Sequence, residues 1–249
     1  MSRAFAGSSA SVSFGSLVLA ALIVLSPPRA EAGEVVVVPV AQDESVVSGT
    51  PDKNLHDSSV SGGLFTGVDG GVSGSAHFYL KFLLPARSPG AVAERATLLG
   101  YYASDFHDLD DGLHAIEFVQ SDLWTEETIT WANQPGPAYG FAEAAWDAAA
   151  NQAGTEQALD LTAIVQQEFA GDGVLSLQVK AFNEGITSEN NNWEYFVEKE
   201  FDPMRAFRLE MVVHTPVQLT VPLPPAGWAG LMMLGAIGAV SAIRTRMAR

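Results

Sequence analysis

Residues His77–Leu84 read HFYLKFLL, and this stretch indicates which kind of fold the chain adopts. Polar and apolar residues alternate within it before Pro85, which is typical of a β-strand with one face in a core. Similar short runs lie on both sides of it along the chain: Glu34–Val40, Ala96–Tyr102, Leu113–Val119, Leu175–Lys180 and Phe207–His214. Glycine, proline, asparagine and aspartate separate these runs. Many short strands joined by frequent turns predict an all-β protein, and specifically a β-sandwich.

One short helix is expected among the strands. Within Asp160–Ala170, four apolar residues fall on one helical face: Leu161, Ile164, Val165 and Phe169. Asp160 or Thr162 can cap the start of this helix, and Gly171 can end it. A different signal comes from Ser58–Ser75, which is rich in glycine and serine, and we predict a mobile loop there.

The composition limits the chemistry available to the middle of the chain. Residues 33–221 carry 28 acidic and 8 basic residues, a net charge of −20. Nucleic acid and anionic membrane surfaces are therefore excluded as partners of this part, because binding either one requires a basic surface. The 249 residues include no cysteine, which excludes thiol catalysis, zinc–thiolate sites and iron–sulfur clusters. Core packing, with or without the help of a bound metal ion, must hold the fold together.

Residues 1–32 have the organisation of a cleavable signal peptide. Arg3 provides a positive start, and Phe14–Leu25 forms a short apolar stretch, which we expect to be a signal helix. Small residues, Ala30 and Ala32, stand at the two positions that a signal peptidase inspects. We predict cleavage after Ala32, so that residues 33–221 form the exported module.

Residues 222–249 resemble a membrane-type sorting tail. An uncharged run, Ala226–Ile243, is followed by Arg244, Arg246 and Arg249. A helix of that length reaches about 27 Å, which is enough to span a bilayer with the arginines on the cytoplasmic side. We expect this tail to be the only part of the chain that contacts a membrane.

The start of this tail carries a sorting motif. Val221, Pro222, Leu223 and Pro224, followed by Pro225, resemble the VPLPA-type variant of the PEP-CTERM class of bacterial tails, which usually has alanine in the fifth position. The resemblance implies recognition by an exosortase-type membrane protease. It also implies release to the cell envelope or extracellular matrix of a polysaccharide-making Gram-negative bacterium.

Five segments of the module follow one another in the order of a second family pattern. They read DESVVSGTPDKN at Asp43–Asn54, FYLKF at Phe78–Phe82, ATLL at Ala96–Leu99, WTEETITWANQP at Trp124–Pro135 and FVEKE at Phe196–Glu200. Together they resemble the DNRLRE domain family of disaggregatase-related carbohydrate-binding modules, over about residues 40–213. The resemblance implies a jelly-roll β-sandwich that binds polysaccharide without cleaving it. The chain departs from the family at Leu55-His56, where an aromatic residue and glycine are usual, and in an acidic insert at residues 103–112.

Aromatic side chains are the natural candidates for sugar binding, because their faces stack on sugar rings. The candidates are Trp193, Trp146, Tyr139 and Tyr195, with Trp193 placed after three asparagines. Trp124 and Trp131 belong to the tryptophan signature, where Thr128–Thr130 favours strand. We interpret the signature residues as structural: Trp124, Thr130, Trp131, Asn133 and Pro135.

Four aspartates ahead of Gly112 gather hard oxygen ligands of the kind that calcium requires: Asp105, Asp108, Asp110 and Asp111. Their spacing is not that of an EF-hand, and a solvated acidic loop is the favoured alternative. Calcium is the only cofactor that the sequence suggests. The histidines form no recognised metal-binding spacing, and we expect His77 and His114 to be structural residues of strands.

The sequence contains no nucleophile elbow or phosphate-binding loop. Neighbouring carboxylates are frequent by chance among so many acids, so they do not indicate a glycosidase. We therefore predict an exported, non-catalytic protein that binds or organises extracellular polysaccharide. The alternatives are a structural or adhesion protein of the matrix and, less favoured, a polysaccharide lyase or hydrolase, since no separate catalytic domain remains.

Overall fold

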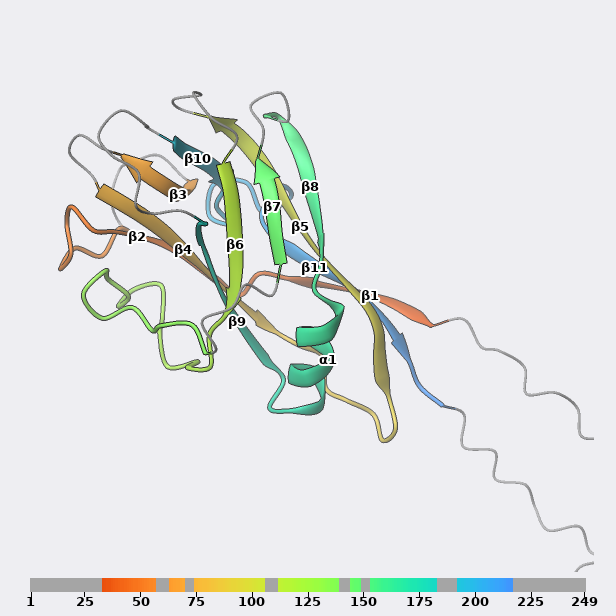
Figure 1. Ribbon diagram of the computed structural model, residues 1–249. Helices are drawn as coiled ribbons and strands as arrows, with labels where there is room; N and C mark the ends of the chain where they lie inside the picture. The colour runs from red at the N-terminus through yellow and green to blue at the C-terminus, as the bar shows by residue number, and fades with distance from the viewer. Residues whose placement is uncertain are drawn as a thin grey trace, which may run out of the picture. The chain divides into compact units, whose positions relative to one another are not determined.

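The computed structural model describes residues 33–56, 63–69, 74–105, 112–138, 144–148, 153–182 and 192–216 (Figure 1). Within these ranges the chain forms eleven strands and one helix. The first strands are β1 (Glu34–Pro39), β2 (Gln42–Val47), β3 (Gly63–Asp69), β4 (Gly74–Leu83), β5 (Val92–Asp105) and β6 (Gly112–Phe118). The others are β7 (Ala144–Ala148), β8 (Thr155–Asp160), β9 (Val174–Ala181), β10 (Asn192–Val197) and β11 (Arg208–His214), with the helix α1 (Thr162–Ala170) between β8 and β9.

The described strands pair in an antiparallel sheet that folds over on itself. Its order is β1-β11-β5-β10-β3-β4-β9-β6-β7, with β2 paired to β4 and β8 paired to β5. One large apolar core joins the two halves of this order, with buried residues from β4, β6 and β9 packed against residues from β5, β10 and β11. Its largest fully buried side chains are Phe78, Phe82, Tyr102, Phe196 and Phe207. The predicted all-β sandwich with one short helix is confirmed.

Helix α1 covers part of the sandwich by packing against β5 and β9. Its buried residues are Ile164, Val165 and Phe169, which belong to the apolar face expected from the sequence. The Asp160 carboxylate accepts hydrogen bonds from the backbone N–H and the hydroxyl of Thr162, at 2.9 and 2.5 Å. The helix ends at Ala170, directly before Gly171, as predicted.

The predicted mobile loop Ser58–Ser75 is wrong for its middle part, because Gly63–Asp69 is the strand β3. Leu64 and Phe65 are buried in it, and its backbone pairs with both β10 and β4. Its glycines have packing and conformational roles rather than a loop role. A Cβ on Gly63 would lie 2.0 Å from the Tyr195 ring, and Gly67 has a φ of 127°, which favours glycine.

Four further strands do not stand out as apolar runs: β2, β8 and β10 carry many polar residues, and β7 is short and mostly alanine. In β2, Asp43 and Glu44 are buried although both are acidic. In β10 the same is true of Glu194, whose carboxylate lies 2.6 Å from His114 of β6 with both side chains almost fully buried. Their burial depends on partners that are far away in the sequence.

Candidate functional site

A turn-rich loop, residues 119–138, covers the outer face of β4 and β9. The expectation that Thr128–Thr130 favours strand is wrong, because the backbone of this loop is bonded locally. The N–H groups of Thr128 and Ile129 both donate to the carbonyl of Thr125. The Asn133 side chain accepts from the Thr130 N–H at 2.7 Å and donates to the Thr128 carbonyl at 2.9 Å. These bonds leave no free run of backbone to join a sheet.

Side chains from β4 attach both ends of this loop to the sheet. Lys81 is buried, and its ammonium group donates to the carbonyls of Asp122 and Trp124 and lies 4.4 Å from the Trp124 ring centre. Near the other end of the loop, the Tyr79 hydroxyl donates to the carbonyl of Pro135 at 2.9 Å. The Tyr79 and Trp124 rings meet edge to face at 5.6 Å in a small core of their own. Trp124 is therefore buried, with no face free for a sugar ring.

The other signature residues lie on the same loop. Trp131 is half-buried with its ring 4.6 Å from that of His77, and Thr130 and Pro135 are half-buried as well. Asn133 is exposed and bonds within the loop, as described above. Asn54, which ends the first signature segment, donates to the carbonyls of Glu126 and Ile129 at 2.7 and 2.8 Å. Three of the five signature segments, at Asp43–Asn54, Phe78–Phe82 and Trp124–Pro135, therefore converge on one structural unit.

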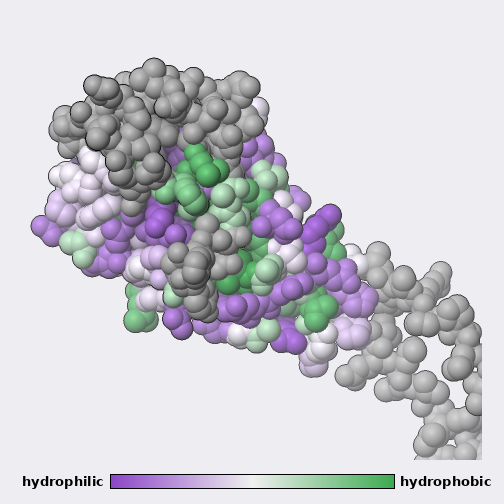
Figure 2. Space-filling model, viewed as in Figure 1, coloured by the Kyte–Doolittle hydropathy of each residue, from purple (hydrophilic) through white to green (hydrophobic). Residues whose placement is uncertain are grey.

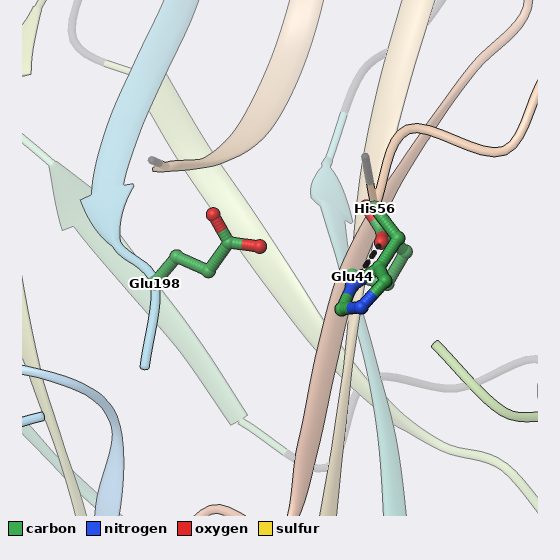
Figure 3. A group of neighbouring side chains, drawn as sticks. All are labelled: Glu44, His56 and Glu198. Carbon is green, nitrogen blue, oxygen red and sulfur yellow. Dashed lines mark ion pairs between the residues drawn. The ribbon is translucent and has the colours of Figure 1, made fainter. Parts of the chain in front are cut away.

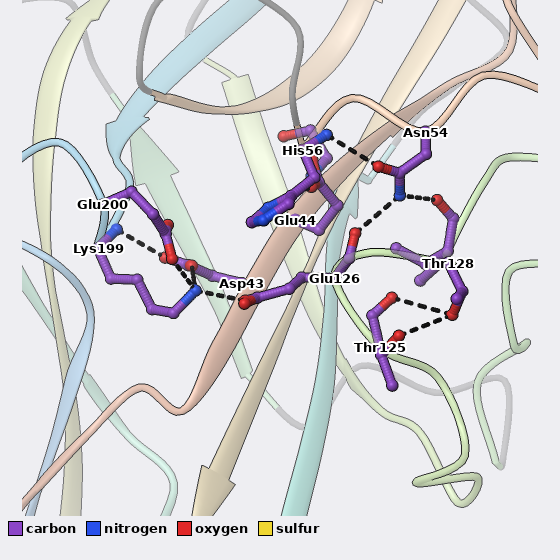
Figure 4. Close-up of polar contacts among 11 residues, drawn as sticks. Asp43, Glu44, Asn54, His56, Thr125, Glu126, Thr128, Lys199 and Glu200 are labelled. Carbon is purple, nitrogen blue, oxygen red and sulfur yellow. Dashed lines mark hydrogen bonds and ion pairs between the residues drawn. The ribbon is translucent and has the colours of Figure 1, made fainter.

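A charged cluster around Lys199 joins three of the five segments, those that contain Asp43, Glu126 and Lys199 itself (Figure 4). The Lys199 ammonium group lies 3.2 Å from the carboxylate of Asp43 in β2 and contacts the carboxylates of Glu126 and Glu200. The Lys199 backbone N–H also donates to Asp43 at 3.0 Å. Asp43 is completely buried and Glu126 is largely buried, whereas Glu200 is exposed. One internal cation therefore neutralises carboxylates from three segments of the chain.

Burial and charge compete in this cluster. Burial raises the pKa of Asp43 to about 6, and the positive charge of Lys199 offsets only part of that rise. Burial lowers the pKa of Lys199, but hydrogen bonds to Glu126 and Glu200 and attraction to Asp43 outweigh it, so this pKa is raised above its ordinary value. The lysine is therefore a fixed positive charge at neutral pH.

A second polar group adjoins the first (Figure 3). Glu44 of β2, His56 in the segment after β2, and Glu198 directly after β10 bring their ligand atoms within 4.8 Å of one another. Burial raises the pKa of Glu44 to about 8 and that of Glu198 to about 7. One imidazole and two carboxylates are side chains that hold metal ions in proteins. No site was predicted here from the sequence, where the only signal was the pair of acids shortly before Val46-Val47 in a strand-like segment.

Four of the predicted sugar-binding and calcium-binding residues belong to strands that share one end of the sandwich: Trp193 and Tyr195 in β10, Trp146 in β7 and Asp105 in β5. The strand pairing shows which strand ends lie side by side. The start of β10 pairs with the ends of β5 and β3, with Glu194 opposite Asp105 and Trp193 opposite Gly67. The start of β6 pairs with the ends of β7 and β9, with His114 opposite both Trp146 and Ala181. We call this end, formed by Asp105, Gly112, Ala148, Ala181 and Asn192, the β10 end; it is at the top in Figure 1. The backbone thus brings together residues that are far apart in the sequence.

The described side chains at the β10 end differ in exposure. Tyr195 is half-buried, with its ring edge-on to Phe65 at 5.1 Å. Phe182, which follows β9 directly, is 61% exposed, and its backbone N–H donates to the carbonyl of Leu113, itself 45% exposed. Phe182 was not predicted as a site residue, because a single phenylalanine after a strand carries no distinguishing signal. The side chains of Trp193, Trp146 and Asp105 lie outside what the structure describes.

Several predictions fall on segments outside the described residues. These are Tyr139, the aspartates Asp108, Asp110 and Asp111, the cleavage residues Ala30 and Ala32, and the sorting motif Val221, Pro222, Leu223 and Pro224. Within the part of the chain that the structure describes, no helix has the length and apolar character needed to cross a membrane.

Comparison with known proteins agrees with the fold and the signature segments. No curated protein matches the chain. Carbohydrate-binding module family 96 matches residues 41–195, which is more than half of the 249 residues. The match contains the β2 carboxylates, the loop over β4 and β9 and most of the strands at the β10 end. The chain belongs to carbohydrate-binding module family 96.

Proposed function

We propose that this protein binds extracellular polysaccharide through the β10 end of its sandwich and does not cleave the polymer. Family membership is the observation that carries the proposal. Phe182 supports it, because an exposed aromatic face next to the apolar Leu113 suits stacking on a sugar ring. Trp193 and Trp146 stand on strands that reach the same end, and polar contacts from neighbouring residues would orient the ring.

The distribution of carboxylates supports binding rather than hydrolysis. A glycosidase needs two carboxyl groups that flank the sugar linkage. Asp43 and Glu44, two of the acids that the fold brings together, are buried, and the ammonium group of Lys199 neutralises the first. Figure 2 shows a largely hydrophilic face with smaller apolar areas, a surface suited to a solvated exported module.

The experiment compares two aromatic variants with a matched control. Binding to a panel of bacterial polysaccharides is measured by affinity electrophoresis and a glycan array, with the purified protein. Phe182→Ala and the double variant Trp193→Ala, Trp146→Ala are each expected to lose at least about tenfold in affinity. Phe201→Ala is the control, because Phe201 is 70% exposed but lies beyond the opposite end of β10. Unchanged binding by both aromatic variants would refute the location, and new reducing ends or unsaturated products would refute the absence of catalysis.

Export to the polysaccharide-rich cell envelope or extracellular matrix belongs to the same proposal. Signal peptidase would remove residues 1–32, and an exosortase-type protease would act at Val221–Pro224, so that membrane attachment is transient and confined to the tail. The sequence patterns of the two ends support this route. Mass spectrometry of the mature protein tests it: termini at residue 33 and near Pro224 are expected, whereas an intact tail overturns the sorting step.

A second function, adhesion by protein contacts in the matrix, is favoured by the edge strand β1. Within the described strands β1 pairs only with β11, and Val35 and Val37 are 64% and 52% exposed on it. An exposed apolar edge strand is a surface that pairs with other chains. No binding to any glycan, together with self-association that Val35→Lys abolishes, would establish this function instead.

A further inference from the structure

Glu44, His56 and Glu198 form a compact set of potential metal ligands drawn from three parts of the chain. Glu44 projects from β2, His56 lies in the segment that follows that strand, and Glu198 follows β10. Figure 3 shows the Glu198 carboxylate extending toward Glu44 and His56 from the other side. The three ligand atoms lie within 4.8 Å of one another. This set is separate from the β10 end, so the inference is independent of the proposed function.

One carboxylate oxygen in this set is buried and accepts no hydrogen bond. Glu44 is 3% exposed, and its Oε1 accepts from the backbone N–H of Ser45 at 2.8 Å. Its Oε2 is buried without a hydrogen-bond partner and faces His56 Nδ1 at 3.6 Å, a distance too long for a hydrogen bond. His56 Nδ1 is also buried without a hydrogen-bond partner. Buried polar atoms of this kind normally have partners, so two of them facing each other indicate a ligand between them.

The position of His56 is set by the rest of the fold. Its backbone N–H donates to the side-chain oxygen of Asn54 at 3.1 Å. Asn54 is in turn held by its two bonds to carbonyls of the loop at residues 119–138. The imidazole is therefore attached to a bonded framework, which is what a pre-formed metal site requires.

The adjoining carboxylates provide a contrast within the same structure. Asp43, Glu126 and Glu200 also bring their oxygens within 4.8 Å of one another. The ammonium group of Lys199 contacts all three, so that group already contains its cation. In the set of Glu44, His56 and Glu198, no ion pair with a lysine or arginine is found among the described residues.

We propose that Glu44, His56 and Glu198 bind one divalent transition-metal ion of the zinc class, with water as a further ligand. An imidazole nitrogen with two carboxylate oxygens suits zinc, whereas calcium takes six to eight oxygen ligands. Zinc bonds of about 2.0–2.2 Å place neighbouring ligand atoms about 3.3 Å apart. Small rotations of the half-buried His56 and Glu198 side chains would shorten the distances between the ligand atoms from at most 4.8 Å to about 3.3 Å.

The ion would connect β2, the segment after β2 and the segment that follows β10 at Glu198. Glu198 is far from Glu44 and His56 in the sequence, and the chain has no cysteine with which to cross-link these parts. A metal ion that binds only the folded state stabilises it in proportion to the logarithm of its concentration. The role of the site is therefore structural.

The test uses the purified, tag-free full chain, stripped with EDTA and titrated with zinc chloride. Calorimetry is expected to show one ion per chain, and a hundredfold excess of zinc over Kd is expected to raise Tm by about 5–10 °C. Cobalt(II) should give visible absorption bands of a site with nitrogen and oxygen ligands. Absence of binding up to 1 mM zinc, or calcium binding as tight as zinc binding, would overturn the proposal.

Variants locate the ion. His56→Ala and Glu198→Gln are expected to weaken zinc binding by at least about 100-fold, since loss of a supporting residue alone costs 10–100-fold. Glu127→Gln is the control, because Glu127 is an exposed acid on the neighbouring loop and should leave Kd within threefold of the native value. Circular dichroism of each metal-free variant checks that it folds. Zinc affinity that both ligand variants retain would place the ion elsewhere and refute the assignment.

Discussion

Replacing Lys199 with methionine tests the internal ion cluster most directly. The change removes the ammonium group that neutralises Asp43 while keeping a side chain of similar length. The charged or titratable groups around Asp43 are Lys199, Glu126 and Glu200, with Glu44, His56 and Glu198 in the adjoining set. Because Asp43 is fully buried, it can avoid an unpaired charge in the variant only by taking up a proton. The loss of stability should therefore depend on pH.

The magnitude follows from the pKa of Asp43, which burial raises from 3.8 to about 6. A raised carboxyl pKa means that the folded state binds more protons than the unfolded state, so stability falls as pH rises through this interval. At pH 7.5 the raised pKa of Asp43 lowers the stability of the native protein by about 3 kcal/mol. In the variant, where Asp43 must stay protonated to remain buried, the corresponding loss at pH 7.5 is about 5 kcal/mol. The difference predicts a loss of about 2 kcal/mol in the variant, to which the partly exposed Glu126 and Glu200 add about 1 kcal/mol at most. At pH 5 the folded native protein already holds the Asp43 proton, so the loss should fall below about 1 kcal/mol.

Urea unfolding of both proteins with EDTA present, followed by tryptophan fluorescence near pH 5 and pH 7.5, measures these differences. Lys53→Met is the matched control, because it removes an exposed lysine and should change the free energy of unfolding by less than about 0.5 kcal/mol at either pH. Equal losses at the two pH values, or a loss at pH 7.5 no larger than that of the control, would show that Lys199 does not neutralise Asp43 in the folded protein.

Three further changes test the packing around the site. Asn54→Ala should cost about 1–3 kcal/mol and raise hydrogen exchange in the loop over β4 and β9, because two loop carbonyls lose their donor; unchanged exchange would contradict this. Gly100→Ala should cost about 1–3 kcal/mol in urea unfolding, because the new Cβ would lie 2.1 Å from the buried Phe207 ring; a neutral result would mean that the ring moves freely. Glu194→Ala should cost about 1–3 kcal/mol in the same assay, since it removes the carboxylate that lies 2.6 Å from the buried His114 side chain, and a loss under about 0.5 kcal/mol would count against that contact.

A strand could be predicted from the sequence when its own apolar residues account for its burial, and not when its burial depends on distant partners. Strands β4, β9 and β11 are buried through their own apolar residues, and their sequences predicted them. Strand β2 has Asp43 and Glu44 inside it, and these acids are buried only because Lys199 and the segments beside it lie next to them in the fold. A pattern of polar and apolar residues along one strand contains no information about a partner 156 residues away.

The same limit applied to the site. Asp43, Asn54 and Glu126 stood inside the signature segments, but their spacing along the chain did not show that they converge. Asp43 and Glu126 both contact Lys199, and the Asn54 side chain donates to the Glu126 carbonyl. These contacts are tertiary, because they join β2 and the segment after it to the loop over β4 and β9 and to the segment that follows β10. Phe182 was missed for a different reason, because exposure of a single aromatic side chain is a property of the folded surface.

Strand β10 runs between two regions of the molecule. Its first residues reach the end where Trp193 and Phe182 are proposed to meet a sugar, and it ends at Val197, just before Glu198 and Lys199 with their polar groups. Four of the five signature segments serve the second region: they hold the loop on the sheet and bury oppositely charged groups next to each other. The residues in these segments therefore have structural roles. Family membership indicates the fold of this chain, but it does not identify the glycan that the chain binds. The identity of the glycan should depend on residues at the β10 end, and changes around Lys199 should alter stability without altering which glycan is bound.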